Sequence, residues 1–238
     1  MIEPPAASRC RLAGVPRTAA GRAMFHLFHH IPKSAGTSCV VAMASLAHVV
    51  RDYHASTSQA DLLRYDAERV DLSRLTPADI LCGHWNLPGR LLLQRYPDLE
   101  ARAPRKITFI REPLAMARSG VRYGIQQGWY REGAQDRALV GRAAYCSTML
   151  ACDEDNFRGV IDGYWFVGIT EHLQEGFDQL ATRMGRPAVQ LPRVNTTDGI
   201  DVVFSDDAIA EFKARSRVDY LIHAHATVLH RQRSAIGA

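Results

Sequence analysis

Residues 25–38 read FHLFHHIPKSAGTS, and this stretch decides the fold. An apolar run typical of a β-strand enters a short loop, and a helical pattern leaves the loop after Gly36. The loop brings backbone N–H groups, a helix N-terminus and the ammonium group of Lys33 to one point, which is how proteins hold phosphate. It is not a Walker A loop, because no Gly-Lys-Ser/Thr order follows a glycine at the required spacing. The alternative is a plain strand-to-helix turn with Lys33 in solvent.

The rest of the chain repeats this alternation of short apolar runs and helical patterns, which predicts an α/β fold. We expect a central parallel sheet flanked by helices. Because no internal repeat or linker divides the chain, we predict a flexible N-terminal segment at 1–22 and a single domain at 23–233. The predicted strands are 24–30, 79–83, 106–110 and 164–169, and the predicted helices are 37–50, 134–151, 170–184, 206–215 and 218–233.

The composition is that of an ordinary globular protein, since 47% of the 238 residues are hydrophobic and 23% are charged. A net charge of +4 fits an anionic ligand but is too small to indicate nucleic acid. No run approaches the roughly 20 apolar residues of a membrane span, and no secretion signal is found, so stable membrane insertion is not expected. The five cysteines form no Cys-x-x-Cys pair, which favours buried thiols in the cytoplasm over disulfides or zinc.

A second informative stretch is KITFIREPLAMARSGVRY at residues 106–123, where Arg111 ends a predicted strand. Pro113 suits the first turn of the helix that follows, because its fixed φ fits that position. Arg111 can grip phosphate oxygens with two N–H groups, and Ser119, two turns along the helix, can donate to the same group. The alternative is that Arg111 caps carbonyl groups or pairs with Glu112 on the surface.

The two stretches are more informative together, because ligands of an open parallel sheet bind beyond the carboxyl ends of its strands. In the predicted fold these ends carry Lys33, His84 and Arg111. None of the strand ends carries the aspartate that a nucleotide–magnesium site normally uses. The sequence therefore predicts a cationic site for an anionic ligand, without metal ligands.

Both stretches resemble a known family. IPKSAGTS at residues 31–38 resembles the 5′-phosphosulfate-binding loop of the sulfotransferases that include heparan sulfate 2-O-sulfotransferases and many bacterial relatives. REPLAMARS at residues 111–119 is similar to the 3′-phosphate-binding element of that group, although alanines replace its charged and bulky residues and Gly120 follows the serine. Residues 167–185 and 219–226 resemble later segments of the same enzymes.

The resemblance implies a P-loop-like three-layer sandwich. It also implies an enzyme that moves a sulfuryl group from 3′-phosphoadenosine 5′-phosphosulfate (PAPS) to a hydroxyl of a carbohydrate, glycolipid or other small acceptor. Adenosine 3′,5′-bisphosphate is the second product, and no metal is expected, because sulfuryl bears less charge than phosphoryl. Lys33 would stabilise the charge that develops on the leaving oxygen. By the same resemblance, the 3′-phosphate is bound by Arg111 and Ser119, and the 5′-phosphosulfate by Lys33, Ser34, Gly36, Thr37 and Ser38.

The acceptor hydroxyl needs a base, and His84 in the stretch CGHWNLPGR is the candidate. An unperturbed pKa of about 6.5 leaves its imidazole mostly neutral, and Gly83-His84 matches a Gly-His pair that supplies the base in the family. The alternative is a hydrogen-bonded histidine in a loop. Trp85 either stacks under an acceptor sugar or packs in the core, and the same alternatives hold for Trp129 and Tyr130.

Two rival functions are a kinase-like phosphotransferase or nucleoside triphosphatase on the same scaffold, and a non-catalytic nucleotide-binding module. Magnesium-dependent ATP turnover would indicate the first, and PAPS binding without transfer would indicate the second. Asn195 and Thr196 lie in a loop that we expect to close over the nucleotide. No metal-ligand role is predicted for His29, His30, His172, His223, His225 or His230.

Overall fold

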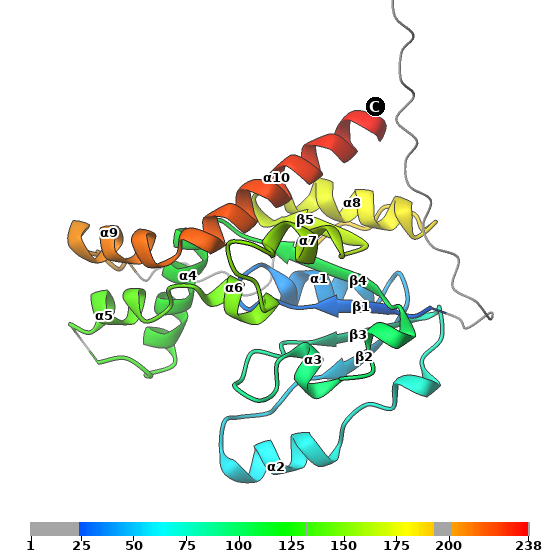
Figure 1. Cartoon of the computed structure of the whole chain (residues 1–238), viewed down its shortest axis with the longest axis horizontal. Helices are drawn as coiled ribbons and strands as arrows, with labels where there is room; N and C mark the ends of the chain where they lie inside the picture. Colours follow the sequence, from blue (N-terminus) through cyan, green and yellow to red (C-terminus); the bar gives the residue numbers. More distant parts are fainter. Residues whose placement is uncertain (1–23, 132, 193–200, 238) are drawn as a thin grey trace, which may run out of the picture.

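The computed structural model of the chain describes residues 24–131, 133–192 and 201–237. Five parallel strands form one sheet in the order β2-β3-β1-β4-β5 (Figure 1). Because β1 lies in the middle, the chain completes one half of the sheet before β4 begins the other half on the far side of β1. The strands are β1 (His26–His29), β2 (His48–Asp52), β3 (Asp79–Gly83), β4 (Arg105–Ile110) and β5 (Phe166–Ile169).

Helices connect the strands, and several begin where the sequence predicts. Pro113 occupies the first turn of α4, and Ser205 accepts a hydrogen bond from the N–H of Ala208 to cap α9. Three short 3₁₀ turns are η1 (Leu72–Arg74), η2 (Glu100–Arg102) and η3 (Thr170–His172). The α-helices are α1 (Gly36–Met43), α2 (Gln59–Ala67), α3 (Leu92–Arg95), α4 (Pro113–Gln126), α5 (Gln135–Val140), α6 (Tyr145–Leu150), α7 (Phe157–Asp162), α8 (Leu173–Arg183), α9 (Asp206–Arg215) and α10 (Arg217–Gly237).

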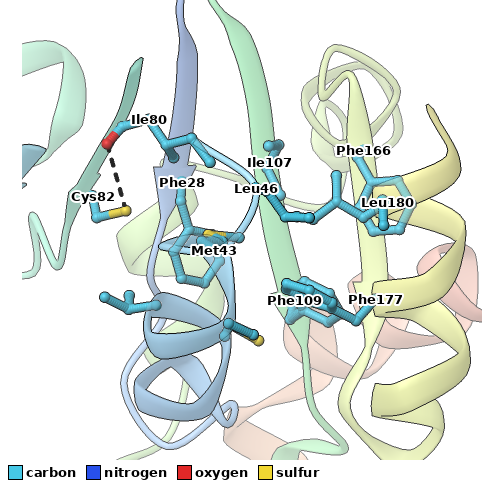
Figure 2. Close-up of a cluster of buried hydrophobic side chains, with 14 residues drawn as sticks. Phe28, Met43, Leu46, Ile80, Cys82, Ile107, Phe109, Phe166, Phe177 and Leu180 are labelled. Carbon is cyan, nitrogen blue, oxygen red and sulfur yellow. Dashed lines mark hydrogen bonds between the residues drawn. The ribbon is translucent and has the colours of Figure 1, made fainter. Parts of the chain in front are cut away.

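One face of the sheet packs against α1 and α8. Phe28, Phe109 and Phe166 extend from β1, β4 and β5 into this layer, where Met43 of α1 and Phe177 of α8 meet them (Figure 2). All five side chains are buried. Fully burying side chains of this size contributes about 1.5–3 kcal/mol each, so this layer is a main source of stability.

The opposite face is also covered, because neighbouring residues on a strand point to opposite sides of a sheet. Val167 and Ile169 of β5 pack with Ile222 and Ala226 of α10, and Leu81 of β3 packs in a cluster that includes α3. Figure 1 shows α10 lying along the β5 side of the sheet beside α8. Burial on both faces explains why the central strands read as continuous apolar runs.

Two of the predicted helices are wrong in part. The helix predicted at 37–50 ends at Met43, and residues 48–52 instead form β2, which pairs in parallel with β3. The β-branched Val49 and Val50 favour a strand at that edge of the sheet. The helix predicted at 134–151 is two helices, α5 and α6, because Ala144 adopts a left-handed conformation at φ 56°.

The α/β class with a parallel sheet flanked by helices is confirmed, and the four predicted strands begin and end within a residue or two of observed ones. Strand β2 and helices α2, α3 and α7 were not predicted. The last helix continues past the predicted domain end at 233 to Gly237, and the predicted flexible segment 1–22 lies outside the described residues. Within the described ranges, no helix is both long and apolar enough to cross a membrane.

Candidate functional site

The candidate site lies where the strand order reverses. Strands β1 and β4 are neighbours, but α1 packs on one face of the sheet whereas α4 contributes Met116 to the opposite face. The hydroxyl of Thr108 on β4 donates to the carbonyl of His29 on β1 at 2.9 Å and holds the two strand ends together. The loops that follow β1 and β4 therefore diverge at the position where open parallel sheets bind ligands.

The loop between β1 and α1 leaves backbone donors free. Lys33 at φ 70° and Ala35 at φ 58° adopt left-handed conformations that turn the chain into α1. None of the described residues accepts a hydrogen bond from the N–H groups of Gly36, Thr37 or Ser38, and no side chain caps the helix. The first turn contains no acidic residue. Free donors at the positive end of a helix suit a phosphate or sulfate group.

Gly36 has a steric role in this loop. A Cβ at Gly36 would lie 1.8 Å from the ring of His30, so no larger residue fits without moving that ring. The Nδ1 atom of His30 shares a hydrogen bond with the hydroxyl of Tyr53 at 3.1 Å, and its ring centroid lies 4.3 Å from that of His84. Rings in edge-to-face contact thus connect the start of α1 with the predicted base.

Arg111 lies against the Lys33 loop. Its Nη1 donates to the carbonyl of Lys33 at 3.0 Å, so two segments 78 residues apart in the sequence meet. Glu112, which the sequence offered as an alternative partner for Arg111, instead accepts a hydrogen bond from the N–H of Ala115 and caps α4. Burial lowers the pKa of Arg111, although nearby Glu171 and Glu112 oppose that shift. The two segments that the sequence predicts to bind phosphate are therefore in direct contact.

The side chain of Lys33 is surrounded by aromatic and cationic groups. Its Nζ lies 4.2 Å from the centroid of the Tyr123 ring on α4. Burial lowers the pKa of Lys33, and the positive charges of Arg142 and Arg111 lower it further. Because a bound anion would offset this repulsion, the arrangement favours an anionic ligand.

Arg142 is a site residue that the sequence analysis missed. It lies between α5 and α6 and faces α4 at Gly120, where a Cβ would be 2.2 Å from its Nε. Its guanidinium also lies 5.4 Å from the centroid of the Tyr145 ring. Because Gly120 has no side chain, the guanidinium of Arg142 fits beside α4 and adds a further cation near Lys33. In the sequence, Gly120 was noted only because it departs from the sulfotransferase pattern. That departure was the one sign in the sequence that another group approaches α4 here.

The hydroxyl residues predicted to bind the nucleotide differ in their surroundings. Ser34 uses both of its donors within the protein, because its N–H bonds to the carbonyl of Ile31 and its hydroxyl to the sulfur of Met116. Thr37 is exposed at the start of α1, and Ser119 is half-buried on α4. Among the described residues, the hydroxyl of Ser119 has no partner, and the same is true of buried Ser38 in α1. Thr37 and Ser119 are therefore accessible to a ligand in this conformation, whereas Ser34 and Ser38 are buried.

His84 follows β3 at the carboxyl edge of the sheet, half-buried against the rings of His30 and Tyr53. Burial, assisted by the charge of His54, lowers the pKa of His84 to about 4. The imidazole is therefore neutral near pH 7 and can accept a proton. Within the described part of the chain, no group forms a hydrogen bond with the His84 ring, so the alternative of a hydrogen-bonded loop histidine is not what the structure shows.

Trp85, next to His84, packs in the core. Its ring is 1% exposed, and its Nε1 donates to Oδ2 of Asp52 at 2.8 Å, so it is not open for stacking on a sugar. Of the other aromatic pair, Tyr130 packs against Gly124, whereas Trp129 is 63% exposed with its ring edge toward Tyr123. The sequence had left both alternatives open for each of these residues.

A polar cavity of about 230 Å³ opens beyond the carboxyl end of β2. Tyr53 lines the cavity, and its ring centroid lies 4.7 Å from that of His84. The cavity carries charges of both signs, and its lining includes Arg51, His54, Asp61, Arg64 and Glu68. The predicted closing residues Asn195 and Thr196 lie outside the described residues.

No protein-family model matches the chain, and no curated protein matches it. Among solved structures, the chain is similar to a sulfotransferase from Alicyclobacillus acidocaldarius, with 13% identity and a TM-score of 0.43. The aligned part covers 85% of this chain and 97% of that one. At this level of similarity, function has to be argued from the residues themselves.

Proposed function

We propose that the chain is a sulfotransferase that uses PAPS as donor and a hydroxyl group as acceptor. The observation that carries the proposal is the contact between Arg111 and the Lys33 loop at the point where the strand order reverses. This contact places the free N–H groups at the start of α1 next to Lys33 and Arg111, two cations from separate segments of the chain. A nucleotide with phosphate groups at both its 5′ and 3′ positions has the charge distribution that such a site needs.

The charges of the site support a doubly phosphorylated ligand. PAPS carries about four negative charges near neutral pH, because the second pKa of a phosphomonoester is about 6. Lys33, Arg111 and Arg142 form a group of cations, and the pKa of Lys33 is lowered by burial and then by repulsion from the two arginines. Arg122 of α4 adds another positive charge close enough to lower the pKa of Arg111. One bound PAPS would offset most of this positive charge.

In the proposed reaction, the start of α1 and Lys33 hold the 5′-phosphosulfate, and Arg111 and Ser119 hold the 3′-phosphate. The acceptor oxygen attacks the sulfur in line with the leaving oxygen, so that a new O–S bond forms as the bond to the bridging oxygen breaks. Lys33 stabilises the negative charge on the departing phosphate oxygen. The neutral ring of His84 takes the proton of the acceptor hydroxyl, and adenosine 3′,5′-bisphosphate leaves.

The acceptor would reach His84 through the cavity beyond β2. Because Tyr53 both lines this cavity and contacts His84, an acceptor held there would place its reacting hydroxyl between His84 and the start of α1, where the sulfuryl group is bound. The lining is polar and carries charges of both signs, which suits a hydroxylated acceptor such as a carbohydrate better than an apolar phenol.

The direct test is incubation of the purified protein with PAPS labelled in its sulfuryl group and a panel of glycans, glycolipids and phenols, in buffer that contains EDTA. We expect label in at least one acceptor, together with release of adenosine 3′,5′-bisphosphate. Lys33→Ala should abolish most transfer, whereas Lys213→Ala, at an exposed position of α9, serves as a matched control. Magnesium-dependent hydrolysis of ATP would instead support a phosphotransferase, and tight PAPS binding without transfer would support a non-catalytic module.

A further inference from the structure

Three potential metal ligands meet on α8 and α10, outside the candidate active site. His172 ends η3, Glu175 lies three residues later in the first turn of α8, and His230 lies on α10. Residues three apart are neighbours on a helical surface, which places His172 beside Glu175. The packing of α10 against α8 adds His230 from a segment 55 residues further along the chain than Glu175. The sequence analysis predicted no ligand role for either histidine.

The donor atoms have nearly the spacing of metal ligands. Nδ1 of His172 is 3.8 Å from Oε2 of Glu175, and Nε2 of His230 is 3.5 Å from Oε1 of the same carboxylate. All three donors lie within 4.8 Å of one another. Ligands at 2.0–2.1 Å from a tetrahedral zinc ion are roughly 3.3–3.4 Å apart, so small side-chain rotations would complete the geometry.

The surroundings already orient the carboxylate and one of the imidazoles. Ser234 donates to Oε1 of Glu175 at 2.5 Å, and Gln179 donates to the Ser234 hydroxyl at 2.9 Å. Such outer hydrogen bonds commonly fix the ligands of metal sites. His230 is 3% exposed, and its ring lies nearly parallel to that of His172. The nearby cation Arg233 donates a hydrogen bond to the carbonyl of Val167.

We propose that His172, Glu175 and His230 bind a divalent transition-metal ion of the zinc class. Two imidazoles and one carboxylate form a donor set that such ions prefer to the all-oxygen sets of Mg²⁺ and Ca²⁺. Ser234 or a water molecule would complete the coordination. Because the ligands come from the start of α8 and the distal part of α10, the ion would fasten these two helices together across β5.

The test uses tag-free full-length protein, stripped with EDTA and then titrated with Zn²⁺ and with Co²⁺. We expect one ion per chain, an absorption band of tetrahedral Co²⁺ in the visible range, and a Tm that rises by roughly 5–10 °C when zinc exceeds its Kd a hundredfold. His172→Ala and Glu175→Gln change exposed or half-exposed side chains, so these variants should fold. They should lose the bound ion, the Co²⁺ absorption band and the rise in Tm. His225→Ala, which removes another histidine of α10 that pairs with Asp162, should keep them.

Equal zinc affinity in the parent protein and His172→Ala would overturn the proposal, and so would a bound ion that leaves the Tm unchanged. Lys33→Ala should bind zinc like the parent protein, because the proposed metal site is separate from the nucleotide site. Loss of zinc binding in Lys33→Ala with retention in Glu175→Gln would place the ion at the other site and contradict the proposal. None of these measurements depends on sulfuryl transfer.

Discussion

Gly120 and Arg142 lie together at one side of the candidate nucleotide site, and the arginine fits there only because residue 120 has no side chain. The guanidinium of Arg142 occupies the space that a side chain at position 120 would take, and it adds positive charge next to Lys33. Charge-assisted hydrogen bonds contribute about 1.5–3 kcal/mol. We therefore predict that Arg142→Ala weakens the binding of adenosine 3′,5′-bisphosphate roughly 10- to 150-fold, as measured by isothermal titration calorimetry.

The control for this prediction is Arg137→Ala, at an exposed position of α5, which should bind like the parent protein. Gly120→Ala offers a second approach, because its Cβ would force the flexible guanidinium of Arg142 to move while all charges are kept. We expect a loss of affinity in the same direction. Full affinity in both Arg142→Ala and Gly120→Ala would exclude Arg142 from the nucleotide site.

Lys33 is predicted to act on the transition state rather than only on binding. Removing one preorganised donor from a developing charge typically costs 10²–10³ in kcat. We expect Lys33→Ala to lose on the order of 10²–10³ in kcat in a transfer assay at saturating PAPS. A variant with unchanged kcat and a raised KM for PAPS would show that Lys33 only binds the donor.

The burial of His84 predicts how kcat/KM changes with pH. A base must be unprotonated, and the lowered pKa of His84, about 4, keeps it so throughout the neutral range. We predict that kcat/KM stays constant as the pH falls from 7 to 5 and decreases only as the pH approaches 4. A decrease of kcat/KM in acid with its midpoint near 6.5, the pKa of an exposed histidine, would contradict this account.

The variant His84→Asn should remove most activity but bind adenosine 3′,5′-bisphosphate normally.

At the residue level, the sequence predicted those groups that lie in local motifs. Lys33 and Arg111 each follow an apolar run, so their position at strand ends could be read from the chain. Arg142 could not be predicted, because it lies within the region 134–151 that the pattern assigned to one helix. Only the left-handed Ala144 breaks that helix, and an alanine gives no sign of such a conformation. The hydroxyl of Ser34 donates to the sulfur of Met116 rather than to a ligand, and no local pattern in the sequence connects these two distant residues.

At the scale of elements, a buried ionic network fastens β2 to the region around α3. Asp52 at the end of β2 accepts hydrogen bonds from Nε and Nη2 of Arg95, both at 2.7 Å, and from Trp85 and Tyr96. The side chains of Asp52 and Arg95 are each 3% exposed. Removing one partner of such a pair leaves an uncompensated buried charge, which costs about 3–5 kcal/mol.

We therefore predict that Asp52→Ala lowers the free energy of unfolding by about 3–5 kcal/mol in a urea titration. The matched control is Arg90→Ala, which breaks a surface pair between Arg90 and Asp66 and should change stability little. A loss in Asp52→Ala no larger than in Arg90→Ala would show that the network adds no stability.

Strand β2 also shows the limit of pattern reading at this scale. Residues 44–50 continue the helical spacing of α1, so the local pattern extended that helix through them. The strand forms because its backbone pairs with β3, a segment about 30 residues further along the chain, and because the network around Asp52 fixes its end. Both causes are non-local, and neither is visible in the sequence of β2 itself.

At the scale of the whole molecule, the α/β class was predictable because four of the five strands and the longer helices carry their own local patterns. The order β2-β3-β1-β4-β5 was not predicted, since it arises from long-range pairing. That order puts α1 and α4 on opposite faces and brings Lys33, His84 and Arg111 to one edge. No single segment of the chain contains the site; the topology of the sheet assembles it.

The central claim is that the Lys33 loop and Arg111 together hold one nucleotide without a metal ion. The most direct measurement is calorimetric titration in EDTA with adenosine 3′,5′-bisphosphate and with adenosine 5′-phosphosulfate, which lacks the 3′-phosphate. We predict binding of both compounds by the parent protein, weaker binding of both by Lys33→Ala, and weaker binding of only the 3′-phosphorylated compound by Arg111→Ala. Equal effects of Arg111→Ala on the two ligands, or binding that appears only when magnesium is added, would contradict the claim.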